Sequence, residues 1–190
     1  MTEAELRTIL ECAMLEAGSE GKSFDTIVAS GWRSAYPHGT ATDKVIEEGD
    51  LVTFDFGAIY HGYHSDITRT VAVGEISERQ RYIYDAVLGC NEHIEKILRA
   101  GLAAADVDQE SRKYLKEKDL DKWFGHALGH SVGLEIHETP TLSPRDHTVL
   151  CAGMTETVEP GVYIPGVGGV RIEDTVVIEK DGISILTKFP

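Results

Sequence analysis

Residues 51–73, LVTFDFGAIYHGYHSDITRTVAV, decide the fold because they hold two β-rich runs joined by a polar, glycine-containing segment. Both runs, 51–56 and 66–73, are rich in the β-branched and aromatic residues that favour strands. A long hairpin is the natural connection between two such runs. We therefore predict two neighbouring strands in this part of the chain.

Each predicted strand carries an aspartate with no evident structural purpose. Asp55 alternates with Phe54 and Phe56, so its side chain points to the other face of the strand. A buried, unpaired carboxylate is costly, so Asp55 needs a cation or strong hydrogen-bond donors. Asp66 opens the next strand, and the hairpin can return it beside Asp55. Since two adjacent carboxylates repel, the pair indicates a bound metal ion.

A second pair of carboxylates, Glu159 and Glu173, lies in two further β-rich runs of the chain. Strand parity puts Thr157 on the same face as Glu159. It likewise puts Arg171 on the same face as Glu173. We expect these polar faces to meet across a second pairing of strands.

Between the two carboxylate pairs, residues 125–138 read GHALGHSVGLEIHE and supply His126, His130 and His137. The repeated glycines disfavour a regular helix. Ala127 stands where a helical zinc motif would carry its glutamate, so that motif does not apply. One imidazole and four carboxylates suit a pair of divalent first-row ions with mixed nitrogen and oxygen ligands.

The rest of the chain alternates helical and β-rich segments. Apolar spacing and capping signals predict helices at 2–17, at 77–100, and from about 106 or 108 to 118. Further β-rich runs occupy residues 26–30, 155–164, 170–178 and 183–186. This order predicts an α+β fold with an approximate two-part repeat of a helix followed by paired strands. Because no low-complexity linker divides the chain, we predict a single domain over residues 1–190.

Composition excludes several classes of partner. Acidic residues outnumber basic ones by 32 to 18, and the formal charge of −14 disfavours a nucleic-acid ligand. Cys12, Cys90 and Cys151 are far apart and odd in number, which indicates neither a disulfide framework nor a cysteine zinc site. No stretch approaches the ~20 apolar residues that span a bilayer. We therefore expect no membrane partner and a cytoplasmic protein.

Together these motifs resemble the pita-bread metallopeptidases, a family that includes methionine aminopeptidases, prolidases and Xaa-Pro aminopeptidases. The resemblance runs over nearly the whole chain and is closest to the proline-specific branch. It is carried by SFDTIV (23–28), PHG (37–39), TFDFG (53–57), SDITRT (65–70), GH (129–130), HE (137–138), TVEPG (157–161) and VRIED (170–174). It implies the creatinase/aminopeptidase-like pita-bread fold, an α+β fold with a pseudo-two-fold repeat, as one catalytic domain over residues 1–190. Because such proteins usually carry a further N-terminal helix, and the proline-specific ones an N-terminal domain, we expect a truncated form.

The resemblance also implies a set of metal ligands. Asp66 and Glu173 would bridge two ions. Asp55 would hold one ion, and His130 and Glu159 would complete the other. Mn or Co is expected, with Zn or Fe also compatible with the ligand set.

Catalytic and substrate-binding roles follow from the same resemblance. His38 and His137 would contact the substrate and stabilise the tetrahedral intermediate, and Glu159 would shuttle the proton. His126 and Arg171 would shape the site that receives proline. Arg171 would pair either with a substrate carboxylate or with a carboxylate of the site wall, or it would offset the surplus charge of the ligands. Two threonines, Thr68 and Thr157, would orient ligands.

The implied activity is that of a dinuclear-metal exopeptidase, in which a metal-bridging hydroxide attacks the Xaa-Pro peptide bond. Its substrate would be a peptide with proline at the second position, and a homodimer is possible. Two alternatives remain: a methionine aminopeptidase that uses the same ligands, and a non-catalytic module of this fold that binds peptides. The VRIED segment with its Arg171 favours the proline-specific branch.

Overall fold

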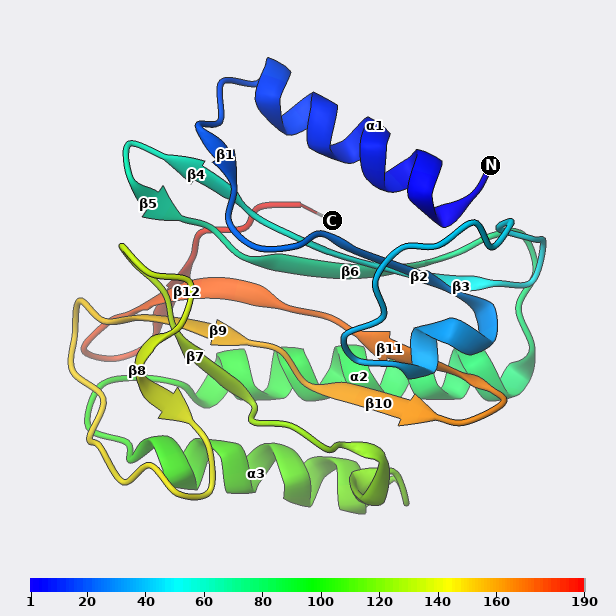
Figure 1. Ribbon diagram of the computed structural model, residues 1–190. Helices are drawn as coiled ribbons and strands as arrows, with labels where there is room; N and C mark the ends of the chain where they lie inside the picture. The colour runs from blue at the N-terminus through cyan, green and yellow to red at the C-terminus, as the bar shows by residue number, and fades with distance from the viewer. Residues whose placement is uncertain (190) are drawn as a thin grey trace.

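The computed structural model describes residues 1–189. Strands form the middle of the molecule, with α1 above them and α2 and α3 below (Figure 1). The helices are α1 (Glu3–Glu16), α2 (Glu78–Ile97) and α3 (Ala104–Lys116), with short 3₁₀ turns η1 (Gly31–Ala35) and η2 (Asp121–Trp123). This arrangement places the strands, and the residues they carry, between the helical layers.

The strands of the first half form two small antiparallel sheets. One sheet has the order β1-β4-β5, with β1 (Gly21–Lys22), β4 (Ala58–Tyr60) and β5 (Tyr63–His64). The other has the order β2-β3-β6, with β2 (Ile27–Ser30), β3 (Leu51–Phe56) and β6 (Ile67–Ala72). The predicted pair of strands is confirmed as β3 and β6, with Asp55 opposite Thr68. The hairpin between them contains the additional strands β4 and β5.

The strands of the second half form a five-stranded sheet and a two-stranded ribbon. The sheet has the order β13-β12-β9-β7-β8, with β7 (Gly129–Ser131), β8 (Glu138–Leu142), β9 (Thr155–Val158), β12 (Asp174–Ile178) and β13 (Ile183–Ile185). The ribbon pairs β10 (Gly161–Ile164) with β11 (Gly168–Arg171). Each half therefore has helix followed by antiparallel strands, as the sequence predicts.

Capping explains where two of the helices begin. The Thr2 hydroxyl accepts a hydrogen bond from the Glu5 amide at 3.1 Å, and the Glu5 carboxylate accepts one from the Thr2 amide at 2.8 Å. This reciprocal capping box satisfies two amides of the first turn. Ser77 and Gln80 form the same arrangement before α2. Both starting points agree with the predicted ones.

Three predicted boundaries were wrong. Helix α3 begins at Ala104, earlier than expected, because its first amides donate to backbone oxygens of residues 146 and 148 and need no side-chain cap. The predicted run 155–164 is broken after β9, where Pro160 lacks the N–H that would continue the ladder. The run 170–178 is likewise broken between β11 and β12. Both breaks fall at the predicted ligands Glu159 and Glu173.

The hydrophobic core lies between α2, α3 and the strands of the second half. Ile83, Val87 and Ile94 of α2 are fully or almost fully buried, as are Val158 of β9 and Val176 of β12. This packing fixes the sheet that carries the C-terminal carboxylates. Cys12, Cys90 and Cys151 are free thiols, and of these only Cys90 is buried. Among the helices described, none is long and apolar enough to cross a membrane.

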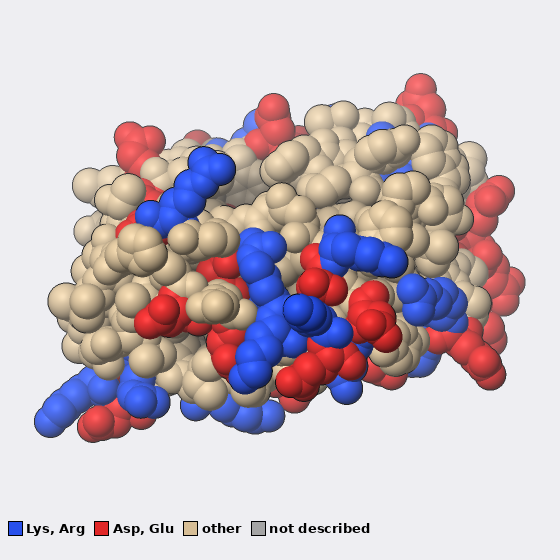
Figure 2. Space-filling view, turned by 90° about the horizontal axis from the view of Figure 1, so that it is seen from below, with Lys and Arg blue, Asp and Glu red and all other residues tan. Residues whose placement is uncertain are grey.

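Charges of both signs are mixed on the face seen in Figure 2. On α3, for example, Lys113 Nζ lies 3.3 Å from Glu110 Oε1. Lys and Arg side chains gather near the middle of this view and lie beside Asp and Glu side chains. On this face the basic side chains are thus accompanied by acidic ones.

Candidate active site

A cleft of about 630 Å³ lies between the two halves of the chain. All the predicted metal ligands, and all four predicted substrate-binding residues, line it. Its walls are formed by Phe24, Asp25, Ile27, Pro37, His38, Thr40, Asp55, Asp66, His126, Ala127, Gly129, His130, Ile136, His137, Thr141, Glu159, Arg171 and Glu173. The cleft thus brings together residues as far apart in the chain as Phe24 and Glu173.

Three of the predicted ligands form a compact cluster. Suitable oxygen and nitrogen atoms of Asp66, His130 and Glu173 all lie within 4.8 Å of one another. Asp66 and Glu173 are 5% and 2% exposed. The Thr68 hydroxyl donates to Glu173 Oε2 at 2.6 Å, and the Glu173 amide donates to the Thr68 carbonyl at 3.1 Å. Thr68 therefore joins the two halves directly beside the cluster and orients the Glu173 carboxylate.

His130 is held with one ring nitrogen facing the carboxylates. Its Nδ1 lies 3.0 Å from the Ser131 carbonyl oxygen, which can only accept, so Nδ1 carries the hydrogen. Nε2 then lies 3.5 Å from Asp66 Oδ2 and 3.6 Å from Glu159 Oε1. Burial and the neighbouring His137 lower the pKa of His130, so the ring is neutral near pH 7. Its free Nε2 has the form that a metal ligand requires.

A close approach of β7 and β9 positions His130 beside Glu159. A Cβ added to Gly129 would lie 1.9 Å from the Thr157 carbonyl oxygen, so only glycine fits at this position. The Thr157 hydroxyl accepts from the His130 amide at 3.1 Å and donates to Glu159 Oε1 at 3.2 Å. Through these two hydrogen bonds Thr157 would orient the Glu159 carboxylate, which is the role predicted for it.

Asp55 is held from the opposite half of the chain by Arg171. The Arg171 Nη2 atom donates to Asp55 Oδ2 at 2.6 Å. The other carboxylate oxygen, Oδ1, is buried and makes no hydrogen bond within the described chain. A buried carboxylate oxygen without a donor is costly, and a cation would satisfy it.

The crowded carboxylates disfavour one another's charge. Burial, together with Asp55 and Glu159, raises the pKa of Asp66 to about 9. Burial raises the pKa of Glu159 to about 8. Burial and the adjacent Asp66 raise the pKa of Glu173 well above its usual range. A divalent cation removes this repulsion, so the donor set, four carboxylates and one neutral imidazole, fits two such ions.

His126 belongs to a hydrogen-bonded row that ends at Asp55. Its Nδ1 donates to the Ala127 carbonyl at 2.7 Å, and its Nε2 accepts from the Tyr163 hydroxyl at 2.8 Å. Arg171 Nη1 donates to the same hydroxyl at 2.8 Å. Burial lowers the pKa of His126 to about 4, which keeps the ring neutral. The row thus links the predicted proline-receiving wall to a predicted metal ligand.

The two remaining histidines stand at the open side of the cleft. His137 is exposed, and its ring packs edge-on against His130 with centroids 4.5 Å apart. His38 is also exposed and lies in the loop of residues 37–39 that follows η1. Both side chains can therefore reach a molecule in the cleft without displacing the buried residues.

Sequence reasoning missed Tyr163 and the apolar part of the wall. Tyr163 alternates with its neighbours in the same way as Glu159 and Gly161, which places all three on one face of an extended chain. This alternation could have indicated that Tyr163 lies on the side of the predicted ligand Glu159. A Cβ on Gly161 would lie 2.4 Å from the Tyr163 hydroxyl oxygen and 2.9 Å from His126 Nε2, so glycine permits their contact. Phe24 and Ile136 line the cleft from loops outside the ligand-bearing strands, and no spacing pattern indicated them.

Comparison with known proteins gives a family for this arrangement. The model of metallopeptidase family M24 matches residues 1–180. An Xaa-Pro dipeptidase of Pyrococcus furiosus is 51% identical over 186 residues, which cover 98% of this chain and 53% of that protein.

Two solved structures are similarly close. An Xaa-Pro dipeptidase from Bacillus anthracis superposes with a TM-score of 0.99 at 52% identity, over all of this chain and 54% of that one. An X-Pro aminopeptidase from Thermotoga maritima superposes with a TM-score of 0.97 at 47% identity, over all of this chain and 54% of that one.

The chain spans about half the length of the relatives it matches. Over that span the predicted α+β pita-bread fold is confirmed, because the helices and strands superpose on those of the solved relatives. The match of the family model extends over 180 of the 190 residues. On this ground, and with its cleft of converging carboxylates and histidines, the chain belongs to metallopeptidase family M24.

Proposed function

We propose that the protein is a metallo-exopeptidase that uses two divalent metal ions to hydrolyse the peptide bond before proline. The observation that carries this proposal is the convergence of four carboxylates and the neutral His130 in one cleft. The choice of substrate is supported by relatives with about 50% sequence identity, which are named Xaa-Pro dipeptidase or X-Pro aminopeptidase. The substrate is a peptide with proline at its second position.

The proposed ligands divide between two ions. Asp66 and Glu173, the two carboxylates of the compact cluster, are the proposed bridging pair. Asp55, with its free Oδ1, holds one ion. His130 and Glu159, whose Nε2 and Oε1 atoms are 3.6 Å apart, complete the other. Mn or Co suits this mixture of oxygen and nitrogen ligands.

Bound divalent ions supply two effects, a lowered pKa of a water molecule and a polarised scissile carbonyl. The protein supplies proton transfer and orientation. Glu159 takes the proton of the attacking water at its carboxylate and passes it to the departing proline nitrogen. His137 and His38, exposed at the cleft opening, donate hydrogen bonds to the developing oxyanion.

Preference for proline is assigned to the wall of His126 and Arg171. The bond before proline has no N–H, so binding cannot depend on that donor. Arg171 uses four N–H groups on Asp55, Tyr163, the Pro37 carbonyl and Thr68. Of the roles predicted for Arg171, these contacts favour pairing with a carboxylate of the site wall. They also make Arg171 part of a rigid surface against which the proline ring of the substrate can pack.

Hydrolysis of Ala-Pro and Met-Ala peptides, with added Mn or Co and with a chelator, tests the proposal. We expect metal-dependent cleavage of Ala-Pro that exceeds cleavage of Met-Ala. The reverse preference would identify a methionine aminopeptidase. Metal binding and peptide binding without any cleavage would identify a non-catalytic peptide-binding module.

A further inference from the structure

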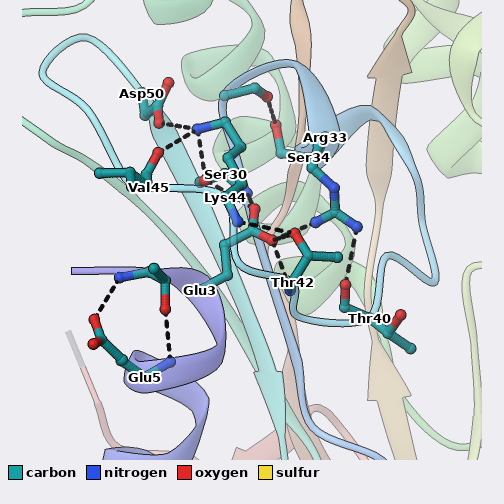
Figure 3. Close-up of polar contacts among 12 residues, drawn as sticks. Glu3, Glu5, Ser30, Arg33, Ser34, Thr40, Thr42, Lys44, Val45 and Asp50 are labelled. Carbon is teal, nitrogen blue, oxygen red and sulfur yellow. Dashed lines mark hydrogen bonds and ion pairs between the residues drawn. The ribbon is translucent and has the colours of Figure 1, made fainter.

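Glu3 is a fully buried carboxylate that lies outside the cleft, in the first turn of α1. It accepts five hydrogen bonds (Figure 3). They come from the Ser30 amide at 2.7 Å and hydroxyl at 2.9 Å, from the Thr42 amide at 3.1 Å and hydroxyl at 2.8 Å, and from Arg33 Nη1. Such a concentration of donors makes this carboxylate a strong local anchor.

Helix α1 does not need this anchor for its own start. The capping box of Thr2 and Glu5 already satisfies the first turn. The amides of Glu3 and Ala4 donate to backbone oxygens of Lys44 and Thr42 at 3.0 and 2.9 Å. The Glu3 side chain therefore serves the segment of residues 30–44 that it holds.

The donors of Glu3 bracket the loop that carries His38. Ser30 and Arg33 precede residues 37–39, and Thr42 follows them. Arg33 also donates from Nη2 to the Thr40 carbonyl at 3.0 Å, which ties the two arms of the loop together. Because the His38 side chain is exposed, its position depends on the backbone that these contacts fix.

The same loop is held from the cleft side. Arg171 Nη1 donates to the Pro37 carbonyl at 3.1 Å, and the Gly169 amide donates to the Ser34 hydroxyl at 2.8 Å. The loop therefore lies between the Glu3 carboxylate on its outer side and strand β11 on its inner side. Loss of either support frees one side of the loop.

We propose that Glu3 is a positioning residue for His38, which it places at the cleft opening by fixing residues 30–44 from behind. This role rests on the proposed function of the cleft, since His38 acts there on the substrate. The Glu3 carboxylate touches neither the cleft nor any proposed metal ligand, so its effect on the reaction passes through the loop.

Backbone hydrogen exchange of the full chain tests the anchor without reference to activity. In Glu3→Gln we expect amides of residues 30–44 to exchange about tenfold faster or more, while those of residues 155–178 stay unchanged. Thr42→Val, which removes one donor, gives a smaller change in the same segment and serves if Glu3→Gln folds poorly. Glu5→Ala is the matched control, because it weakens the start of α1 but leaves the Glu3 contacts intact.

A double-mutant cycle with His38 tests the consequence for catalysis. We expect Glu3→Gln to lower kcat/KM on Ala-Pro by about tenfold or more when His38 is present. In the His38→Ala background the same change should cost nothing further. Glu5→Ala should lower the melting temperature and leave kcat/KM unchanged.

Equal losses of kcat/KM in both His38 backgrounds would overturn the positioning role, as would unchanged exchange of residues 30–44 in Glu3→Gln. These outcomes differ from a failure of the proposed function. If the unsubstituted protein cleaves no Xaa-Pro peptide, the proposed function fails, while the exchange experiment still decides whether Glu3 holds the loop.

Discussion

Arg171 and Asp55 are 116 residues apart in the chain, yet Nη2 of the first donates to Oδ2 of the second at 2.6 Å. Both side chains lie at the wall of the cleft, and Arg171 is 3% exposed. Burial disfavours the charge of Arg171, but Tyr163, Asp55 and Glu159 together raise its pKa well above the usual value. The guanidinium is therefore a permanent charge that orients a proposed metal ligand.

Arg171→Lys should weaken Mn binding by about 10- to 100-fold, because a lysine cannot reproduce the planar fork that fixes Asp55. Calorimetric titration of both proteins with Mn measures this. Arg145→Lys, at an exposed position, is the matched control and should bind Mn normally. Unchanged Mn affinity with a reduced kcat/KM on Ala-Pro would instead assign Arg171 to the substrate.

Mn should raise the melting temperature of the protein by several degrees, since a ligand that binds only the folded state stabilises it. Asp66→Ala removes a proposed bridging ligand and should abolish most of this increase. Asp25→Ala changes an exposed carboxylate of the same cleft and should retain it. An increase of the same size in Asp66→Ala would show that Mn binds elsewhere.

The metal-free protein should lose stability as the pH rises from 7 to 9. Burial raises the pKa of Asp66 to about 9 and those of Glu156 and Glu159 to about 8, so the folded state binds more protons than the unfolded state below these values. The free energy of unfolding therefore falls with rising pH between the unfolded pKa values, about 4, and these raised values, and the fall ends once the groups ionise in the folded state. His126, whose pKa burial lowers to about 4, contributes in the opposite direction only below about pH 7. Urea unfolding in the presence of a chelator at pH 7, 8 and 9 measures the slope.

Glu156→Gln isolates one of these groups. The Ser131 hydroxyl donates to Glu156 Oε1 at 2.7 Å, and glutamine can accept the same bond without titrating. We expect a shallower loss of stability between pH 7 and 9 in this variant, with Mn affinity unchanged. If the two proteins show the same slope, the carboxyl group of Glu156 does not titrate in this range.

Gly129→Ala should lower the free energy of unfolding by about 3 kcal/mol, because its Cβ would lie 1.9 Å from the Thr157 carbonyl oxygen. The added methyl group should push β7 away from β9, and this movement should displace His130 and reduce Mn binding. Gly125→Ala, in the same segment but with open space around its Cβ, should change stability by about 0.5 kcal/mol at most. Equal effects of the two substitutions would contradict this account of the segment.

The sequence predicted the parts of the molecule that local pattern determines. Alternation identified β3 and β6, and polar residues at the wrong places for a core identified Asp55 and Asp66. The same reasoning could not find Glu3, because an acidic residue in the first turn of a helix is expected for helix-dipole reasons alone. Only the folded structure shows that Glu3 is fully buried and that it accepts hydrogen bonds from Ser30 and Thr42.

Boundaries set by distant contacts were also beyond sequence patterns. Helix α3 begins where backbone oxygens of residues 146 and 148 receive its amides, and nothing in the local sequence shows this. Tyr163 packs against His126, which is 37 positions earlier in the chain. Such pairs depend on contacts between segments that are distant in the chain, which no local pattern contains.

The Thr68–Glu173 contact joins residues 105 positions apart, and each half of the chain contributes only part of the proposed ligand set. Neither half can therefore assemble the cluster alone. Contacts of such long sequence separation are expensive in loop entropy and form late in folding. We therefore expect metal affinity to appear only in the last folding step, so that bound metal reports that the two halves have docked.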